Sequence, residues 1–297
     1  MGSVADKIAK KIVSSKRSKV VELTGWREGR KMALEAGFGG DGLALGKFAG
    51  LDPCHALYVV GENVASLMSE SISTMREARG YVRVAGGAED RYLPAGPPMS
   101  PLTVSYFSMW AMFDVRFGSS RETMGSCILR IAPKFDCPSW LVETVERMQQ
   151  SRMGFYVHCG SDGERVLLRE VGTRETVSCT VPAGYTGSEG QIWFVRVLPP
   201  PNRLCRHYIV FNTPYVTRGY PERAFVDCLE RELARLETKK KLAGTGDAHH
   251  HLMKYGPDPN HWNEYVFCAY SGHQHDAIFL TGIPDIRQIL PHASAFQ

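Results

Sequence analysis

Hydrophobic and polar positions alternate most clearly between Met153 and Val216. This stretch holds five short runs rich in Val, Ile, Tyr, Phe and Trp, which are separated by Gly, Pro, Asn and Asp. Runs of this kind, bounded by turn-forming residues, predict antiparallel strands. Residues 191–197 are mostly apolar at both odd and even positions, which indicates a strand packed on both of its faces. The pattern therefore predicts an antiparallel sheet or a small barrel.

A repeat of three to four residues predicts helices in other parts of the chain. Residues 104–117 and 221–241 each place their apolar side chains on one helical face, and residues 261–273 are expected to form a further helix. Residues 276–285 predict a last strand. The predicted fold class is α+β, with a helical N-terminal half, a central antiparallel β-sheet or small barrel, and a C-terminal α/β closing segment.

The length of 297 residues suggests about two domains. We predict a basic amphipathic helix at residues 1–20 and a mainly helical domain at residues 21–152, which contains a glycine-rich loop at 37–50. A β-rich domain follows at residues 153–297, with the helix 221–241 and a C-terminal helix and strand.

The positive charge of the chain is concentrated at its start. Net charge is +4, and the first 20 residues carry +5, so the remaining 277 residues carry −1. A nearly neutral body argues against a protein that binds nucleic acid over its whole surface, although nucleic acid stays a possible partner.

Residues 4–13 place apolar side chains on one half of a helical wheel and lysines on the other half. Such a helix can lie on a membrane surface, contact phosphates or dock on a partner, or it can pack its apolar half on its own domain. Small barrels commonly carry binding surfaces. The residues expected to contact a protein or an anionic partner are Lys7, Lys10, Lys11, Lys16, Arg17, Lys19, Tyr185 and Arg196.

The glycine-rich run at residues 37–50 contains the spacing G-x-G-x-x-G at Gly37, Gly39 and Gly42. Glycines allow backbone N–H groups to approach a phosphate or a ribose closely. The run is not a P-loop, because Phe48 stands where that motif needs Ser or Thr. A simple glycine-rich turn is the other interpretation.

The stretch LEAGFGG (34–40), followed by ALYVVGE (56–62) and GGAEDRYLP (86–94), resembles class I S-adenosylmethionine-dependent methyltransferases. The resemblance implies a Rossmann-like half over about residues 30–94, in which ALYVVGE is a strand and GGAEDRYLP an acidic loop. It further implies that Glu35, Gly37, Gly39 and Glu62 hold S-adenosylmethionine, with Asp90 near the adenine. Outside this interpretation the sequence predicts no cofactor.

Histidines gather near the C-terminus, where they suggest a metal site. His273 and His275 stand two residues apart, as on one face of a strand, and a third ligand such as His251 could come from the triplet 249–251 in the predicted loop 245–260. Three protein ligands with one open position are typical of catalytic zinc. A metal-dependent hydrolase is therefore one hypothesis.

The eight cysteines are scattered and form no C-x-x-C pair. We interpret them as reduced thiols, which are typical of cytoplasmic proteins. The sequence also shows no long apolar run and no signal-type start, so we predict a soluble cytoplasmic protein. No sequence pattern establishes a catalytic residue, so whether the protein is an enzyme stays open. The leading hypothesis is a non-enzymatic binding or adaptor protein that uses the β module and the basic N-terminal arm.

Overall fold

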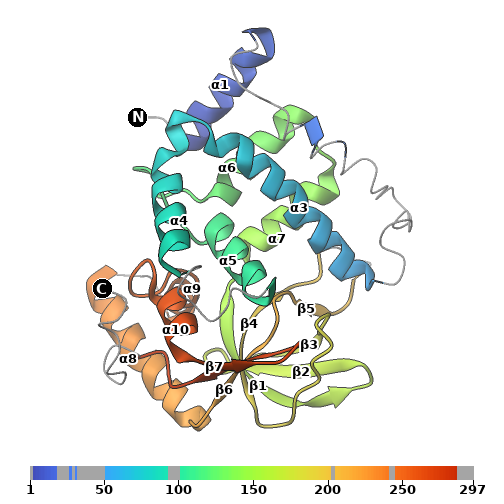
Figure 1. The fold of residues 1–297 in the computed structure, drawn as a ribbon, viewed down its shortest axis with the longest axis vertical. Helices are drawn as coiled ribbons and strands as arrows, with labels where there is room; N and C mark the ends of the chain where they lie inside the picture. Colours follow the sequence, from blue (N-terminus) through green and yellow to red (C-terminus); the bar gives the residue numbers. More distant parts are fainter. Residues whose placement is uncertain are drawn as a thin grey trace. The chain divides into compact units, whose positions relative to one another are not determined.

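The computed structural model describes residues 3–18, 27–28, 31, 51–92, 101–201, 205–240 and 245–285. Within these ranges helices and one eight-stranded sheet form an α+β protein, as predicted (Figure 1). The chain divides into two compact units. Unit 1 comprises Met1–Gly87, Met109–Gln150 and Pro200–Arg206, and unit 2 comprises Ala88–Ser108, Ser151–Pro199 and His207–Gln297. None of the helices in the described part of the chain has the length and apolarity to cross a bilayer.

Unit 1 is helical. Its elements in chain order are α1 (Val4–Ser18), α3 (Pro53–Ser73), η1 (Arg76–Ala78), the start of α4 (Arg79–Tyr92), the end of α5 (Pro101–Phe113), α6 (Met124–Ile131), η2 (Ala132–Phe135) and α7 (Ser139–Gln150). α6 begins with a capping box, in which Thr123 Oγ1 accepts from the Ser126 backbone N–H. α3 and α7 pack closely, because a Cβ on Gly61 would lie only 2.7 Å from Thr144 Cγ2.

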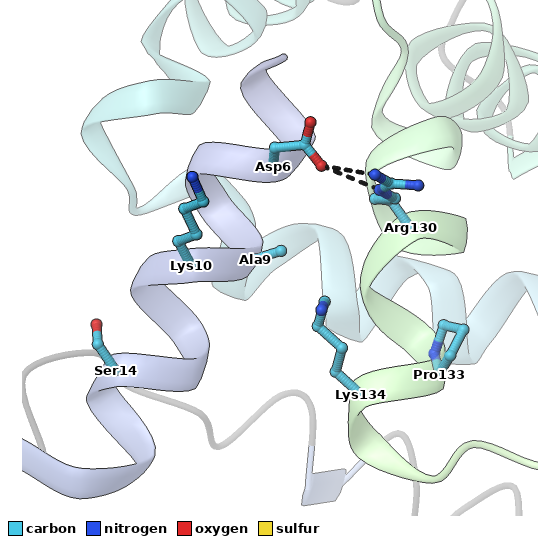
Figure 2. Close-up of a pocket in the computed structure, with 7 residues that line it drawn as sticks. All are labelled: Asp6, Ala9, Lys10, Ser14, Arg130, Pro133 and Lys134. Carbon is cyan, nitrogen blue, oxygen red and sulfur yellow. Dashed lines mark hydrogen bonds and ion pairs between the residues drawn. The ribbon is translucent and has the colours of Figure 1, made fainter. Parts of the chain in front are cut away.

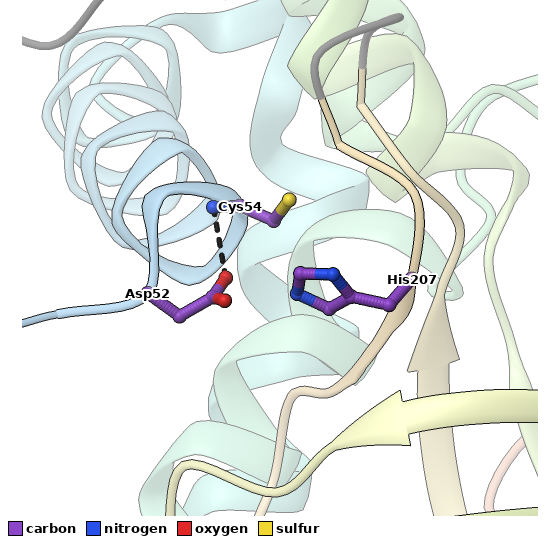
Figure 3. Close-up of side chains that lie close together, drawn as sticks. All are labelled: Asp52, Cys54 and His207. Atoms are coloured by element: carbon purple, nitrogen blue, oxygen red, sulfur yellow. Dashed lines mark hydrogen bonds between the residues drawn. The ribbon is translucent and has the colours of Figure 1, made fainter. Parts of the chain in front are cut away.

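The start of α3 corrects one sequence-based expectation. Residues 56–62 are helical, although the methyltransferase resemblance implied a strand that ends at Glu62. Asp52 caps the helix by accepting from the backbone N–H groups of Cys54 and His55 at 2.9 and 3.1 Å, the first of which is drawn in Figure 3. Pro53 fits the first turn of a helix. These two residues set a helix start that overrides the β-like composition of ALYVV.

Unit 2 is built on a closed barrel of five strands. The strands are β1 (Met153–Asp162), β2 (Arg165–Glu170), β3 (Thr176–Thr180), β4 (Ile192–Leu198) and β5 (Tyr208–Val210). They pair in the order β1–β2–β3–β5–β4, and β4 pairs again with β1. Most pairs are antiparallel, as predicted, but β3 and β5 run parallel. Closure leaves none of these five strands with an unpaired edge along its whole length.

The barrel interior is filled by apolar side chains. On β1 and β4, Tyr156 stands opposite Trp193 and both point into this core, whereas Phe155 stands opposite Phe194 on the outer face. The interior core consists of Tyr156, Val166, Leu168, Cys179, Trp193, Val195, Val197, Val210 and Val216, with Ala277 and Phe279.

Two helices cover the outer face of β1 and β4. α8 (Glu222–Lys240) contributes Phe225, and α10 (His261–Ala269) contributes Trp262 and Tyr265. Their rings lie against Phe155 and Phe194, with centroid separations between 5.1 and 5.9 Å. β4 is consequently buried at every position, which confirms that it packs on both faces.

The C-terminal part of unit 2 extends the sheet. β6 (Tyr215–Arg218) pairs with β4, β8 (Ile278–Thr281) pairs in parallel with β6, and β7 (Tyr270–His273) lies beside β8. The predicted helix 221–241 corresponds to α8. The predicted loop at 245–260 is wrong in its first part, because residues 245–255 form α9 (Thr245–Tyr255), where Ala248, Leu252 and Met253 are buried.

Candidate functional site

The candidate site lies in unit 1, where the basic N-terminal helix packs on α6. Among the described side chains of α1, five are buried and face inward: Val4, Ala5, Ile8, Ala9 and Ile12. The carboxylate of Glu122 accepts from the backbone N–H of Val4 at 2.6 Å and of Ala5 at 3.3 Å. An acidic group at this end satisfies N–H groups that lack partners inside the helix and matches the helix dipole. α1 is therefore fixed to its own unit.

An open hollow of about 620 Å³ lies between α1 and the segment formed by α6 and η2. Figure 2 shows Asp6 of α1 facing Arg130 of α6 across this space. The residues that line it are Asp6, Ala9, Lys10, Ser14, Arg130, Pro133 and Lys134. We call this site the α1–α6 hollow. Its two walls come from residues more than a hundred positions apart in the sequence.

The α1–α6 hollow carries a net positive charge. Lys10, Arg130 and Lys134 are its cations, and Asp6 is the one acidic side chain among the described residues that line it. Lys10 and Lys134 are exposed. Cations that converge on one depression raise the local concentration of anions. Chemically, this arrangement can bind an anion, and the described lining residues include no cysteine or histidine that would suggest a nucleophile or a zinc ligand.

Asp6 and Arg130 form an ion pair at the mouth of the hollow. Nε and Nη2 of Arg130 donate to the same oxygen, Asp6 Oδ1, at 3.0 and 2.9 Å. The hydrogen bond from Arg130 lowers the pKa of the Asp6 carboxyl, and Ser3 lowers it further. Asp6 is thus held in its charged form and pairs with Arg130.

The predicted basic contact residues divide into several groups. Lys10 lines the hollow, whereas Lys7 is exposed and does not line it. Lys11 pairs with Glu77 at 2.6 Å. The backbone at Lys16 and Arg17 belongs to α1, but their side chains lie outside the described part of the structure, as does Lys19. The sequence did not reveal Arg130 and Lys134, because no local pattern marks them as neighbours of α1.

The two predicted contact residues of the β module differ in exposure. Tyr185 is half-buried, packs on Trp193 with ring centroids 5.5 Å apart, and donates to Gln191 Oε1 at 3.2 Å. Arg196 is only 1% exposed, and its Nη1 donates to the carbonyl and hydroxyl oxygens of Ser151, each at 3.1 Å. The expectation that Arg196 lies on a binding surface is therefore corrected, since its side chain is inside unit 2.

The residues implied for S-adenosylmethionine are not brought together in the described structure. Glu35 and the whole glycine-rich run 37–50, with Gly37 and Gly39, lie outside the described residues. Glu62 is in the middle of α3, where burial raises the pKa of its carboxyl. Asp90 lies in α4 rather than in a loop. The helical state of both segments removes the strand and the acidic loop on which that interpretation depends.

The three predicted metal ligands also stand apart. His251 lies in α9 with its ring 5.0 Å from that of Tyr255, and His273 ends β7, where its Nδ1 is 2.6 Å from the hydroxyl of Tyr270. His275 is exposed in the following loop. All three belong to the described residues, and their ring nitrogens form no common cluster there. In the described structure these three histidines therefore do not form the predicted metal-binding group.

A disulfide changes the prediction that all cysteines are reduced. Cys54, the second residue of α3, is bonded to Cys205, and both belong to unit 1. Figure 3 shows the Cys54 side chain at the start of α3 beside Asp52; His207, also drawn there, belongs to unit 2. Both sulfurs are buried. The other six cysteines, all described, form no disulfide.

Comparisons of this chain with known protein families, with curated proteins and with solved structures find no match.

Proposed function

We propose that this protein is a non-enzymatic binding protein that captures an anionic partner through the α1–α6 hollow. The observation that supports this proposal is that Lys10, Arg130 and Lys134 all line one open hollow of about 620 Å³. The two flanking elements are fixed to each other by the buried face of α1 and by the Glu122 cap. A preorganised group of cations binds an anion at a lower entropic cost than lysines on a loose arm.

The partner is expected to be an acidic protein segment or a small anion rather than nucleic acid. Nucleic-acid binders usually carry a basic surface over a wide area, and the chain beyond residue 20 carries a net charge of −1. The β module is proposed as a second contact surface, with Tyr185 as its half-buried aromatic candidate.

The cytoplasmic location stays a prediction, and the Cys54–Cys205 disulfide removes the reduced-cysteine argument for it.

The test measures capture of a fluorescein-labelled peptide of glutamates by fluorescence anisotropy at about 50 mM and about 300 mM salt. The double variant Lys10→Gln and Lys134→Gln removes two exposed charges from the hollow. We expect it to lower affinity about tenfold at low salt and to reduce the salt dependence, because such charges mainly steer association. Deletion of residues 1–20 is a poorer test, since it also removes the buried side chains of α1.

A matched control removes the same charge elsewhere in unit 1. Lys7→Gln with Arg83→Gln changes two exposed cations that do not line the hollow. We expect this control to change affinity less than about twofold. Equal losses in the two double variants would show that overall charge, not the hollow, holds the peptide, and the proposal would then be abandoned. Failure of the wild-type protein to bind the peptide would have the same consequence.

A further inference from the structure

The Cys54–Cys205 disulfide joins a helix to a connection between two strands. Cys54 lies in the first turn of α3, a helix of 21 residues. Cys205 lies in the connection between β4 and β5, of which Pro200–Arg206 belongs to unit 1 although both strands belong to unit 2. The bond therefore fastens a segment whose two ends both leave unit 1.

The position of Cys205 also bears on the barrel strand that follows it. β5 begins at Tyr208, so only Arg206 and His207 stand between this strand and the disulfide. With three residues, β5 is the shortest strand of the barrel, and its ladder with β3 is parallel. Parallel pairing is slightly weaker per residue than antiparallel pairing. Freedom gained at Cys205 consequently reaches the barrel strand that its own ladder holds least.

The other cysteines indicate that the chain is built to keep thiols. Six form no disulfide, and three of these, Cys137, Cys159 and Cys268, are only partly buried. Accessible thiols are open to oxidation, and they persist in compartments that keep cysteines reduced. A disulfide in such a compartment is usually transient and redox-sensing rather than a permanent crosslink. The combination of one bond with partly exposed thiols therefore favours a reversible bond.

The structure allows the bond to open without loss of the fold. Neither cysteine belongs to the core group inside the barrel, and α3 still buries Tyr58, Val64 and Met68. Both cysteines are buried, at 2% and 7% exposure, so a thiol reaches the sulfurs only after a local movement. A connection moves more readily than a packed helix. The exposed Arg206 next to Cys205 places this movement in the connection.

We propose that Cys54–Cys205 is a reversible redox switch, which holds the β4–β5 connection in unit 1 when it is oxidised and releases it when a low-molecular-weight thiol such as glutathione reduces it. A glutathione thiolate attacks one sulfur, so that a mixed disulfide forms and the other cysteine leaves as a thiolate. A second thiolate attacks the mixed disulfide and releases the first cysteine. Two electrons pass to the protein, the two cysteines take up protons, and oxidised glutathione is the product. This switch is separate from the anion site proposed above.

The test follows bond opening and local mobility in the same samples of the full chain. The protein is equilibrated in mixtures of reduced and oxidised glutathione, labelled briefly in deuterated buffer, quenched in acid and analysed by mass spectrometry. We expect a reversible transition from the closed to the open bond. Along this transition, residues 205–210 should exchange their amide hydrogens at least about tenfold faster, whereas β1 and β2 keep their protection.

Two results would overturn the proposal. One is a bond that stays closed in a large excess of reduced glutathione. The other is bond opening that leaves exchange at residues 205–210 unchanged, or that speeds exchange equally in β1 and β2, because the bond would then be a crosslink of the whole fold.

Substitution separates the bond from the reagents. Cys205→Ser should exchange at residues 205–210 as fast as the reduced wild type, both with and without glutathione. The matched control is Cys159→Ser, which changes a partly buried cysteine outside the bond and should keep the full response to glutathione. Protection in Cys205→Ser equal to that of the oxidised wild type would also refute the switch. If Cys205→Ser fails to fold, the glutathione series decides alone, because it needs no substitution.

Discussion

Arg152 donates from Nη1 and Nη2 to the two carboxylate oxygens of Glu170, at 2.5 and 3.1 Å. Glu170 ends β2 and is 5% exposed, and Thr173 donates a further hydrogen bond to it at 2.7 Å. Burial by itself would raise the pKa of Glu170, but the hydrogen bond and the charge of Arg152 hold that pKa below its usual value. The pair links the residue before β1 to the end of β2, inside unit 2.

Loss of the Glu170 charge should strongly destabilise the protein. Glu170→Gln leaves the Arg152 guanidinium buried without its counterion, and breaking a buried pair in this way costs about 3–5 kcal/mol. Urea unfolding measures the change. The matched control is Asp227→Asn, which breaks the exposed ion pair with Arg223 on α8 and should cost less than about 1 kcal/mol. Similar losses in the two variants would contradict an anchoring role for Glu170.

His249 makes stability depend on pH. Its Nδ1 lies 3.4 Å from Arg152 Nη2, and burial followed by the positive charge of Arg152 lowers the pKa of His249 to about 4. As pH falls, the unfolded chain takes up this proton near pH 6.5, whereas the folded chain takes it up only near pH 4. Between these two values protonation favours the unfolded chain, so the free energy of unfolding should decrease as pH falls from about 6.5 to about 4. The difference between the two pKa values corresponds to about 3 kcal/mol.

Urea unfolding at a series of pH values checks this dependence. In His249→Gln most of the pH dependence between about 6.5 and 4.5 should disappear, because glutamine does not titrate. A smaller part should remain, because burial also lowers the pKa of His55. Glu170 also loses stabilising charge in acid, but its lowered pKa places that loss below about pH 4.5. A His249→Gln protein whose stability still falls steeply in the upper range would assign the effect to another group.

Gly125 marks a close contact between α6 and its neighbours. A Cβ at this position would lie 2.5 Å from Cδ1 of Phe113 and would also collide with Gln149. Gly125→Ala should therefore lower the free energy of unfolding by about 1–3 kcal/mol, as overpacking does in a filled core. Gly86→Ala in α4 is the control, because nothing lies within 4 Å of its Cβ position. There alanine should stabilise the helix by up to about 1 kcal/mol.

The sequence predicts the β module well and the elements before and after it less well. Alternation with turn residues indicated the strands between Met153 and Val216, because those signals are local. The apolar run ALYVV was compatible with a strand, yet Asp52 and Pro53 start a helix there. The sequence predicts a loop over residues 245–260, but Ala248, Leu252 and Met253 supply the buried face of α9. At α3 a local helix start therefore overrides the strand propensity of the run, and at α9 the buried apolar face overrides the predicted loop.

The candidate site could be predicted only in part. The basic face of the N-terminal helix is visible in the sequence, since Lys7, Lys10 and Lys11 fall on one half of the helical wheel. Which lysine faces a hollow depends on where α6 packs, and that follows from contacts between residues over a hundred positions apart. Arg130 and Lys134 have no local pattern that pairs them with α1.

The Cys54–Cys205 disulfide predicts a specific count of thiols. Titration in denaturant without reductant should find six thiols per chain, and titration after reduction should find eight. Cys54→Ser should lower the free energy of unfolding by roughly 2–5 kcal/mol, because the bond restricts a long loop of the unfolded chain. Reductant should lower wild-type stability to that of the variant and leave the variant unchanged. The control is Cys159→Ser, which changes a cysteine outside the disulfide. Reductant should lower the stability of this control as it lowers that of the wild type. A count of eight thiols without reductant would show that the bond does not form.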